Sequence, residues 1–355
     1  MGVVLPQEQR LPQTADEIAT YVVGAAVWAP SVHNTQPWRF TAAGAEITLH
    51  ADASRQLHVA DPSGREMVIS CGAALFTAKL ALRSLGYLPE TRVLPDPADP
   101  TLIARLRWRR QASPATAEEQ LFDQVTRRRT HRGGFEPVPP EPGLVEALRQ
   151  DAAQHGTVLR VAITDQARAV LAAITDMAER VQRLDAAHVR ELTAWAPPPG
   201  INRLDGVSAS SYPARPEVMS PYFPGRDFAV GRGWGLPSST AISPTRFAGL
   251  ICLLTTPADV PAAWVDAGQA LQRILLRSAT FGVAAALHSQ PVEVGWLRGA
   301  IRAQLGDGSY PQLLLRLGTV LQNAVSLRRP AESVMMKGRG YPRGRLTGTI
   351  RDGSG

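Results

Sequence analysis

The sequence predicts an α+β protein whose helices and strands are mixed along most of the chain. Apolar residues recur every three or four positions from Met67 to Leu85, which is the spacing of a buried helix. Residues 38–52 and 101–110 instead alternate apolar and polar side chains, as strands do. A second succession of helices and strands begins after residue 116, so we expect two halves of similar plan, although no clear repeat joins their sequences.

The first half is expected to contain two helices, a hairpin and a further strand. The first helix runs into a polar turn, a Gly-containing turn divides the hairpin, and Gly86 ends the second helix. The expected elements are a helix over 14–28, a hairpin over 38–52, a helix over 65–85 and a strand over 101–110.

The second half contains one long irregular segment. Residues 196–246 are rich in Pro, Gly and Ser, and a connection of that length is more often a functional lid than a passive linker. We predict domains over 12–115 and 117–330, followed by a flexible tail rich in Arg and Gly over 331–355. The expected elements are helices over 117–128, 144–155, 166–195, 262–282 and 292–305, and strands over 157–163, 246–256, 283–289 and 311–318.

Composition narrows the class of protein. The 355 residues are 44% hydrophobic and 19% charged, which suits an ordinary globular chain with room for about two domains. The net charge of +7 rests almost wholly on arginine, and no aromatic platform accompanies it, so we expect no nucleic-acid partner. Cys71 and Cys252 lie in apolar contexts, as buried thiols of a reducing compartment do. No signal peptide or uninterrupted apolar span is apparent, so we expect a cytoplasmic protein without a membrane partner.

Several familiar site patterns are absent from the sequence. The glycines of "GRGWG" at 231–235 precede a Pro and Ser stretch instead of a helix, so they do not form a dinucleotide fingerprint. The seven histidines are scattered without metal-ligand spacing, and we expect no metal site. No Walker loop and no G-x-S-x-G elbow is present either.

Three polar features remain. The first is "APSVHNTQPWRF" at 29–40, where Ser31, Asn34 and Gln36 follow a helix. The simplest interpretation is a helix stop in which Ser and Asn satisfy free carbonyls and Trp38 begins a buried strand. A ligand-binding turn is the alternative.

The second feature is "RRRTHRGGF" at 127–135. Arg128, Thr130 and Arg132 supply two guanidiniums and a hydroxyl at alternate positions, which is the chemistry that a phosphomonoester requires. A solvated basic helix end explains the same residues.

The third feature lies near the C-terminus. His288 and Ser289 stand where an apolar strand ends, and strand ends often face a ligand in folds that mix helices and strands. Arg328 and Arg329 come after the last expected strand and could face the same anion; surface arginines are the alternative.

Together, these features resemble the flavin-binding elements of the nitroreductase family, most closely its Acg-like branch. "APSVHNTQPWRF" resembles the family's A-P-S-x-x-N-x-Q-P-W turn, and "RRRTHRGGFEPVP" resembles its R-R-S-x-R-x-F phosphate motif with Thr130 in place of Ser. "FGVAAALHSQPVE", "LGDGSYPQLLLRLG" and "RRPAES" resemble its C-terminal part. The similarity covers roughly residues 15–330, except for 196–246.

The order of the motifs differs from that of the homodimeric members, in which the phosphate motif precedes the turn within one domain. Here the turn comes first and each motif occurs once. The resemblance therefore implies a nitroreductase-like fold of two tandem diverged domains, a pseudo-dimer in one chain that keeps one FMN site. We expect a monomer or a weak homo-oligomer.

The resemblance also implies roles for individual residues. Arg132 would lie near the ribityl chain and the N1/C2 end of the flavin, where a cation stabilises the anionic reduced form. The Ser289 backbone N–H is a candidate partner for N5, beside His288. The phosphate would lie among Arg128, Thr130, Arg328 and Arg329, and the flavin would contact Pro30, Ser31, Val32 and Asn34.

Two functions follow from this resemblance. The first is an FMN-dependent oxidoreductase that passes hydride from NAD(P)H to a nitro compound, a quinone or a similar acceptor, with the flavin and no protein group carrying the chemistry. The second is an FMN-binding or storage protein with little turnover, since residues 196–246 could cover the mouth of the site. An arginine-rich nucleic-acid binder rests on charge alone.

Overall fold

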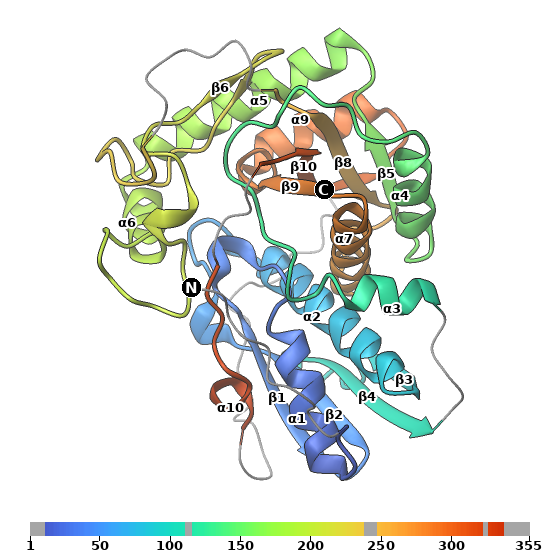
Figure 1. Cartoon of the computed structure of the whole chain (residues 1–355). Helices are drawn as coiled ribbons and strands as arrows, with labels where there is room; N and C mark the ends of the chain where they lie inside the picture. The colour runs from blue at the N-terminus through green and yellow to red at the C-terminus, as the bar shows by residue number, and fades with distance from the viewer. Residues whose placement is uncertain (1–10, 111–115, 238–246, 322–325, 337–355) are drawn as a thin grey trace.

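Two four-stranded antiparallel sheets enclose a pair of long helices, so the prediction of an α+β fold is confirmed (Figure 1). The computed structural model describes residues 11–110, 116–237, 247–321 and 326–336. Parts of the predicted lid (238–246), of the predicted tail (337–355) and of the first domain boundary (111–115) lie outside these residues.

The first half forms the lower sheet of Figure 1, with strand order β1-β2-β4-β3. Thr14 and Glu17 form a capping box that begins its first helix. The expected hairpin is present, with Trp38 opposite Ala51. The elements are α1 (Ala15–Ala26), β1 (Trp38–Ala43), β2 (Glu46–Ala51), α2 (Arg65–Ser84), β3 (Tyr87–Val93) and β4 (Leu102–Arg110).

The second half forms the other sheet, with strand order β5-β8-β10-β9. In each half the first strand is at one edge, the third at the other, and a 20-residue helix joins the second strand to the third. This shared order supports two halves of similar plan. The elements are α3 (Thr116–Phe122), α4 (Leu144–Ala153), β5 (Val158–Val161), α5 (Asp165–Leu184), α6 (Ala186–Trp195), β6 (Val218–Met219), β7 (Phe223–Pro224), β8 (Leu250–Thr256), α7 (Pro261–Thr280), β9 (Val283–His288), α8 (Gln290–Glu293), α9 (Gly295–Leu305), β10 (Tyr310–Thr319) and α10 (Ala331–Val334).

Several expected boundaries were wrong. Strand β3 was not expected, because its sequence contains Pro89 and little apolar alternation; it is an edge strand that pairs with β4 alone. The single helix expected over 166–195 is two helices, since Asp185 leaves helical geometry and caps α6 through Ala187 N. The helix expected over 292–305 begins earlier and is divided at Val294. The expected helix over 117–128 ends at Phe122, so Arg128 is not helical.

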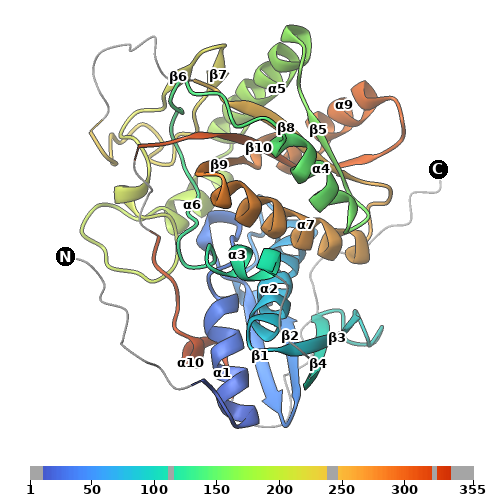
Figure 2. The same cartoon turned by 45° about the vertical axis from the view of Figure 1, so that its right-hand side comes forward.

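Helices α2 and α7 form the centre of the molecule, and both views place them between the two sheets (Figure 2). Helix α2 is long and apolar enough to cross a membrane by length and composition, but 83% of that window is buried inside the molecule. Cys71 on α2 and Cys252 on β8 are buried and unbonded, as expected. One hydrophobic core joins both halves through this helix pair.

Glycine allows α2 and α7 to approach each other closely. A Cβ atom on Gly72 would lie 2.3 Å from the carbonyl oxygen of Val265, and one on Gly268 would lie 2.0 Å from that of Ile69. These neighbours are backbone atoms that cannot turn aside as a side chain can. The helices therefore contact each other at a distance that no other residue permits at these two positions.

We expect Gly72→Ala or Gly268→Ala to destabilise the protein by about 3 kcal/mol, because each added methyl group must push the helix backbones apart. Chemical unfolding measures this change. Gly24→Ala in α1 is the matched control: no atom lies within 4 Å of its added Cβ, so it should stabilise the helix by about 0.5 to 1 kcal/mol. Equal effects at the three positions would contradict the close helix contact.

Candidate functional site

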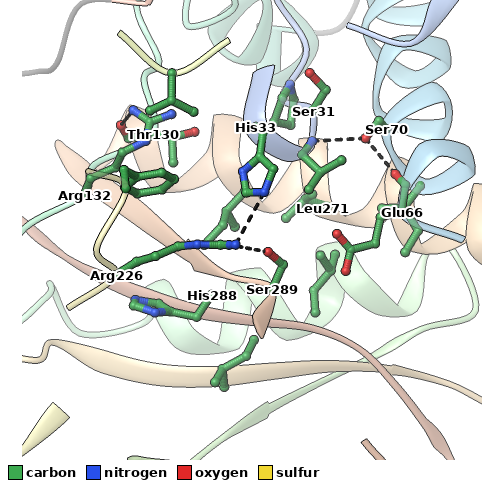
Figure 3. A pocket seen from close by; sticks show the side chains of 18 residues that line it. Ser31, His33, Glu66, Ser70, Thr130, Arg132, Arg226, Leu271, His288 and Ser289 are labelled. Atoms are coloured by element: carbon green, nitrogen blue, oxygen red, sulfur yellow. Dashed lines mark hydrogen bonds between the residues drawn. The ribbon is translucent and has the colours of Figure 1, made fainter. Parts of the chain in front are cut away.

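A cavity lies where the two halves meet beside α2 and α7. Its wall combines the turn after α1, the start of α2, the middle of α7, the end of β9 and part of the irregular segment. The space among these residues is about 700 Å³, including the part that is open to solvent. Figure 3 shows Thr130 and Arg132 on one side, Glu66 and Ser70 on the other, and His33, Arg226 and Ser289 between them.

The turn after α1 has an unusual backbone. His33, Asn34 and Gln36 adopt φ values of 46°, 56° and 51°, in the left-handed region that residues other than glycine rarely occupy. Each such residue costs about 1 kcal/mol or more unless its surroundings hold it in place. Here the Ser31 hydroxyl accepts a hydrogen bond from Gln36 N at 2.9 Å. Pro30, Ser31 and Val32 are thereby held in the wall of the cavity.

Asn34 and Gln36 fasten the turn to two distant segments. The Asn34 amide nitrogen donates to Gly206 O at 3.0 Å and to Leu327 O at 3.2 Å. The Gln36 amide nitrogen donates to Leu204 O, and its oxygen accepts from Arg329 N, both at 2.8 Å. Asn34 does not line the cavity, so its direct contact with a flavin stays a prediction.

The simple helix stop fits only part of this turn. Trp38 does begin a buried strand, as that interpretation requires. The carbonyls just beyond α1 are instead satisfied by arginine: Arg128 Nη2 donates to Trp28 O at 3.2 Å, and Arg328 Nη2 to Ala29 O at 3.4 Å. The two sequence features that lie a hundred residues apart therefore meet at the end of α1.

Arg128, Arg129 and Arg328 gather around Trp28. The guanidiniums of Arg129 and Arg328 lie 4.6 and 5.8 Å from the centroid of its ring. Arg128 is 5% exposed, which excludes the solvated helix end for this residue. Its Nε and Nη1 atoms are buried without a hydrogen-bond partner, and so is Nε of Arg328. Among the described residues, no carboxylate forms an ion pair with these arginines.

Burial and like charge act together on this arginine cluster, which we define as Arg128, Arg129 and Arg328. Burial, with Arg129 and Arg132 nearby, lowers the pKa of Arg128 to about 9. Burial and the same neighbouring guanidiniums lower the pKa of Arg328. A buried charge without a counter-ion costs on the order of several kcal/mol. The cluster therefore fits an anion with several acceptor oxygens, such as a phosphate group.

The remaining residues of the basic motifs occupy different places. Thr130 and Arg132 line the cavity, and Thr130 forms a parallel bridge with Ala285 of β9. Burial and the neighbouring Arg226 lower the pKa of Arg132 to about 10. Arg329 lies apart from the cluster, because its Nη2 atom donates to Ser333 O at 2.8 Å. The structure thus brings Arg328, and not Arg329, beside Arg128.

His288 is fixed by an arginine from the neighbouring strand. Arg316 on β10 is 1% exposed, and its Nε donates to His288 Nε2 at 2.9 Å. Its other nitrogens donate to Ala248 O and Gly133 O, so it also holds the glycines of the basic motif. Burial and the Arg316 charge keep the pKa of His288 well below its ordinary value. The His288 ring is therefore neutral, its Nε2 accepts from Arg316, and the residue forms part of the cavity wall.

The irregular segment covers part of the cavity through residues that the sequence did not single out. Arg226 is 7% exposed; its Nη1 donates to Ser289 Oγ at 2.9 Å, and its Nη2 lies 3.4 Å from His33 Nε2. Phe228 lies between the guanidiniums of Arg132 and Arg226, at 5.6 and 5.4 Å. A charged residue inside an otherwise aperiodic Pro- and Gly-rich stretch was the available signal for Arg226. Glu66 was missed because an acid in the first turn of a helix is ordinary.

Comparison with known proteins identifies the family. No family model matches the chain. A candidate NAD(P)H nitroreductase of Mycobacterium tuberculosis strain H37Rv is 35% identical over 311 residues, which cover 87% of each chain. The chain belongs to the nitroreductase family. The chain is also 28% identical over 305 residues to Acg of the same organism, and the match covers 85% of this chain and 90% of Acg. The resemblance stated from the motifs is confirmed.

Solved nitroreductase structures match only part of this chain. A nitroreductase with bound FMN from Desulfitobacterium hafniense has a TM-score of 0.39 at 13% identity, over 61% of this chain and 96% of its own. The FMN-dependent nitroreductase NfnB of Mycobacterium smegmatis, in complex with NADPH, has a TM-score of 0.33 at 16% identity. The match covers 66% of this chain and 99% of NfnB. The family assignment rests on the sequence relatives alone.

We expect Gln36→Ala to loosen the turn after α1, because Leu204 O and Arg329 N would lose their partner. Each unsatisfied buried backbone group costs about 1 to 3 kcal/mol. Hydrogen exchange should become faster at the Arg329 amide and around residue 204. Gln150→Ala on the exposed face of α4 is the control and should change neither quantity. Unchanged exchange in Gln36→Ala would contradict the fastening role.

Proposed function

We propose that the protein is an FMN-dependent oxidoreductase that uses NAD(P)H to reduce a nitro compound, a quinone or a similar acceptor. The observation that carries the proposal is the buried guanidinium of Arg128, whose Nε and Nη1 have no partner, together with a cavity lined by Thr130 and Arg132 of the same motif. Arg128, Thr130, Arg328 and the more exposed Arg129 would hold the phosphate. Relatives named as candidate NAD(P)H nitroreductases support the choice of reaction.

The cavity has suitable groups for the flavin ring. Pro30, Ser31 and Val32 supply one wall, and His288 and Ser289 supply the opposite wall. When bound, FMN would supply the hydride transfer itself. Arg132 lies at the end of the cavity near the arginine cluster, where its positive charge would favour a reduced flavin anion.

A second function is favoured by the irregular segment. Val207, Arg226 and Phe228 line the cavity, and Arg226 is hydrogen-bonded to Ser289 on the opposite wall. A cover held in this way would suit an FMN-binding or storage protein in which neither NAD(P)H nor an acceptor reaches the ring. The two functions share the cofactor and differ only in access to it.

We expect the purified protein to be yellow, with one FMN per chain, because each motif of the site occurs once. Anaerobic addition of NADPH or NADH should bleach the flavin absorbance rapidly if the protein is a reductase. Bleaching by dithionite alone would support storage. A colourless protein that does not bind added FMN would remove both functions, and two FMN per chain would contradict the single site.

We expect Arg128→Ala to weaken FMN binding by about 10- to 100-fold, which corresponds to the loss of one charge-assisted hydrogen bond. The same change should raise the Tm of the flavin-free protein, because it removes a buried charge that has no counter-ion. Fluorescence titration and thermal unfolding measure these opposite effects. Arg107→Ala, at an exposed pair with Glu46, is the control.

A second pair of variants tests the arrangement of the last two arginines. Arg328→Ala should weaken FMN binding as Arg128→Ala does, whereas Arg329→Ala should have a smaller effect, because its guanidinium faces Ser333. A larger loss in Arg329→Ala than in Arg328→Ala would contradict the phosphate site drawn from the structure.

A further inference from the structure

Three buried carboxyl groups lie at the side of the cavity opposite Arg132. Asp61 and Glu66 are 3% and 4% exposed, and the side chain of Glu293 is 1% exposed. Asp61 precedes α2, Glu66 lies in its first turn, and Glu293 ends α8. Only Glu66 of these three lines the cavity. In Figure 3 its carboxyl projects from α2 toward the middle of the cavity, on the side where Ser289 lies.

Two guanidiniums accompany these three acids. Arg226 from the irregular segment faces Glu293, with Nη2 at 3.7 Å from Oε2. His188 from α6 also lies 3.9 Å from the same oxygen. Arg65, which is 4% exposed, donates from Nη2 to Glu66 Oε1 at 2.8 Å. The Arg65 charge also acts on Asp61 and lowers its pKa, against the larger effect of burial, so one guanidinium serves two carboxyl groups.

Three carboxyl groups beside two guanidiniums favour one proton shared within this group. Burial, together with the negative charges of Glu293 and Asp61, raises the pKa of Glu66 well above its ordinary value. Burial raises the pKa of Asp61 to about 6. Burial also opposes ionisation of Glu293, but the Arg226 charge and its hydrogen-bond partners hold its pKa below the ordinary value. Oε1 of Glu66 accepts from Arg65, which leaves Oε2 as the oxygen that would carry a proton.

We infer that Glu66 is the proton donor to the electron acceptor in this cavity. This inference rests on the proposed reductase function. Reduction of a quinone to a hydroquinone adds two electrons and two protons, and bound FMN would supply both electrons and one of the protons as a hydride. The second proton leaves Glu66 Oε2: its O–H bond breaks, a new O–H bond forms on the quinone oxygen, and the electron pair stays on the carboxylate.

The surroundings of Glu66 suit this proton transfer. Arg65 is already hydrogen-bonded to Oε1, so it stabilises the carboxylate as soon as it forms. The first turn of α2 also favours a negative charge, because its amide dipoles point toward Glu66. Solvent then returns a proton to Oε2, and NAD(P)H supplies the next hydride. Glu66 is therefore assigned as a catalytic residue for acceptors that carry a carbonyl or nitro oxygen.

Rapid mixing tests the role in the reaction. The holoprotein is reduced with dithionite and mixed anaerobically with 1,4-benzoquinone, and the return of flavin absorbance gives the rate. We expect Glu66→Gln to slow reoxidation about 100-fold, the usual contribution of a positioned acid. The wild-type rate should fall as pH rises through the raised pKa of Glu66, and the variant should lose that dependence. Glu66→Asp should restore part of the rate.

Glu90→Gln, at an exposed pair with Arg109, is the matched control and should reoxidise at the wild-type rate. Reoxidation of Glu66→Gln at that same rate with the wild-type pH profile would overturn the inference while leaving the flavin function intact. A wild-type protein that binds no FMN would instead remove the proposed function, and the inference with it. The two failures are thus distinct.

A measurement that needs no turnover tests the proton itself. Infrared difference spectra of the full-length protein at pH 7, wild type minus Glu66→Gln, should show the carbonyl stretch of a protonated carboxyl group. Asp61→Asn should retain this band. The Tm of wild type relative to Glu66→Gln should be highest below about pH 4 and should fall as pH rises, because the unfolded chain ionises first. A wild-type spectrum without the band would overturn the inference.

Discussion

The close contact between α2 and α7 is the constraint on which the site depends. Gly72 and Gly268 allow the two helix backbones to touch, and the cavity is lined by residues within one turn of these glycines. Ile69 and Ser70 come from α2, and Leu271 comes from α7. Each half contributes one sheet and one helix of this central pair. The contact between α2 and α7 therefore also fixes the distance between the turn after α1 and the end of β9. A shift of the helices would change the width of the cavity directly.

The second organising feature is an excess of buried positive charge at one end of the cavity. Arg128 and Arg328 donate to carbonyls beyond α1 but leave buried nitrogens without partners. No described acid forms an ion pair with either of them, whereas the buried guanidiniums of Arg65 and Arg226 each face a carboxylate. Arg65, for example, donates to Glu66 and to Gln312 O. An anionic ligand would therefore stabilise the folded chain as well as bind to it.

Much of the cavity wall could be predicted from the sequence, because the short motifs identified its residues. The periodicity of apolar residues alone predicts only helices and strands. The turn at Pro30 to Val32, the pair Thr130 and Arg132, and the strand end at His288 all line one cavity. Arg226 could not be predicted, since its position depends on how an aperiodic segment folds across the second half. The order of Arg328 and Arg329 could not be predicted either, because adjacent side chains point in different directions. Strand β3 was not predicted because it lies at the edge of its sheet, contains Pro89 and shows little alternation of apolar and polar residues.

The unequal connections in the two halves explain why one chain would hold one flavin. Residues 27–37 join α1 to β1 and have room for a turn that lines a cavity and contacts both halves. The equivalent connection from α4 to β5 is only residues 154–157, which is too short for such a turn. In the second half the long connection lies instead between β5 and β8. Arg226 and Phe228 from this connection cover part of the cavity that the turn of the first half lines. The halves share a strand order, but one supplies the turn that lines the cavity while the other supplies the arginines and the cover.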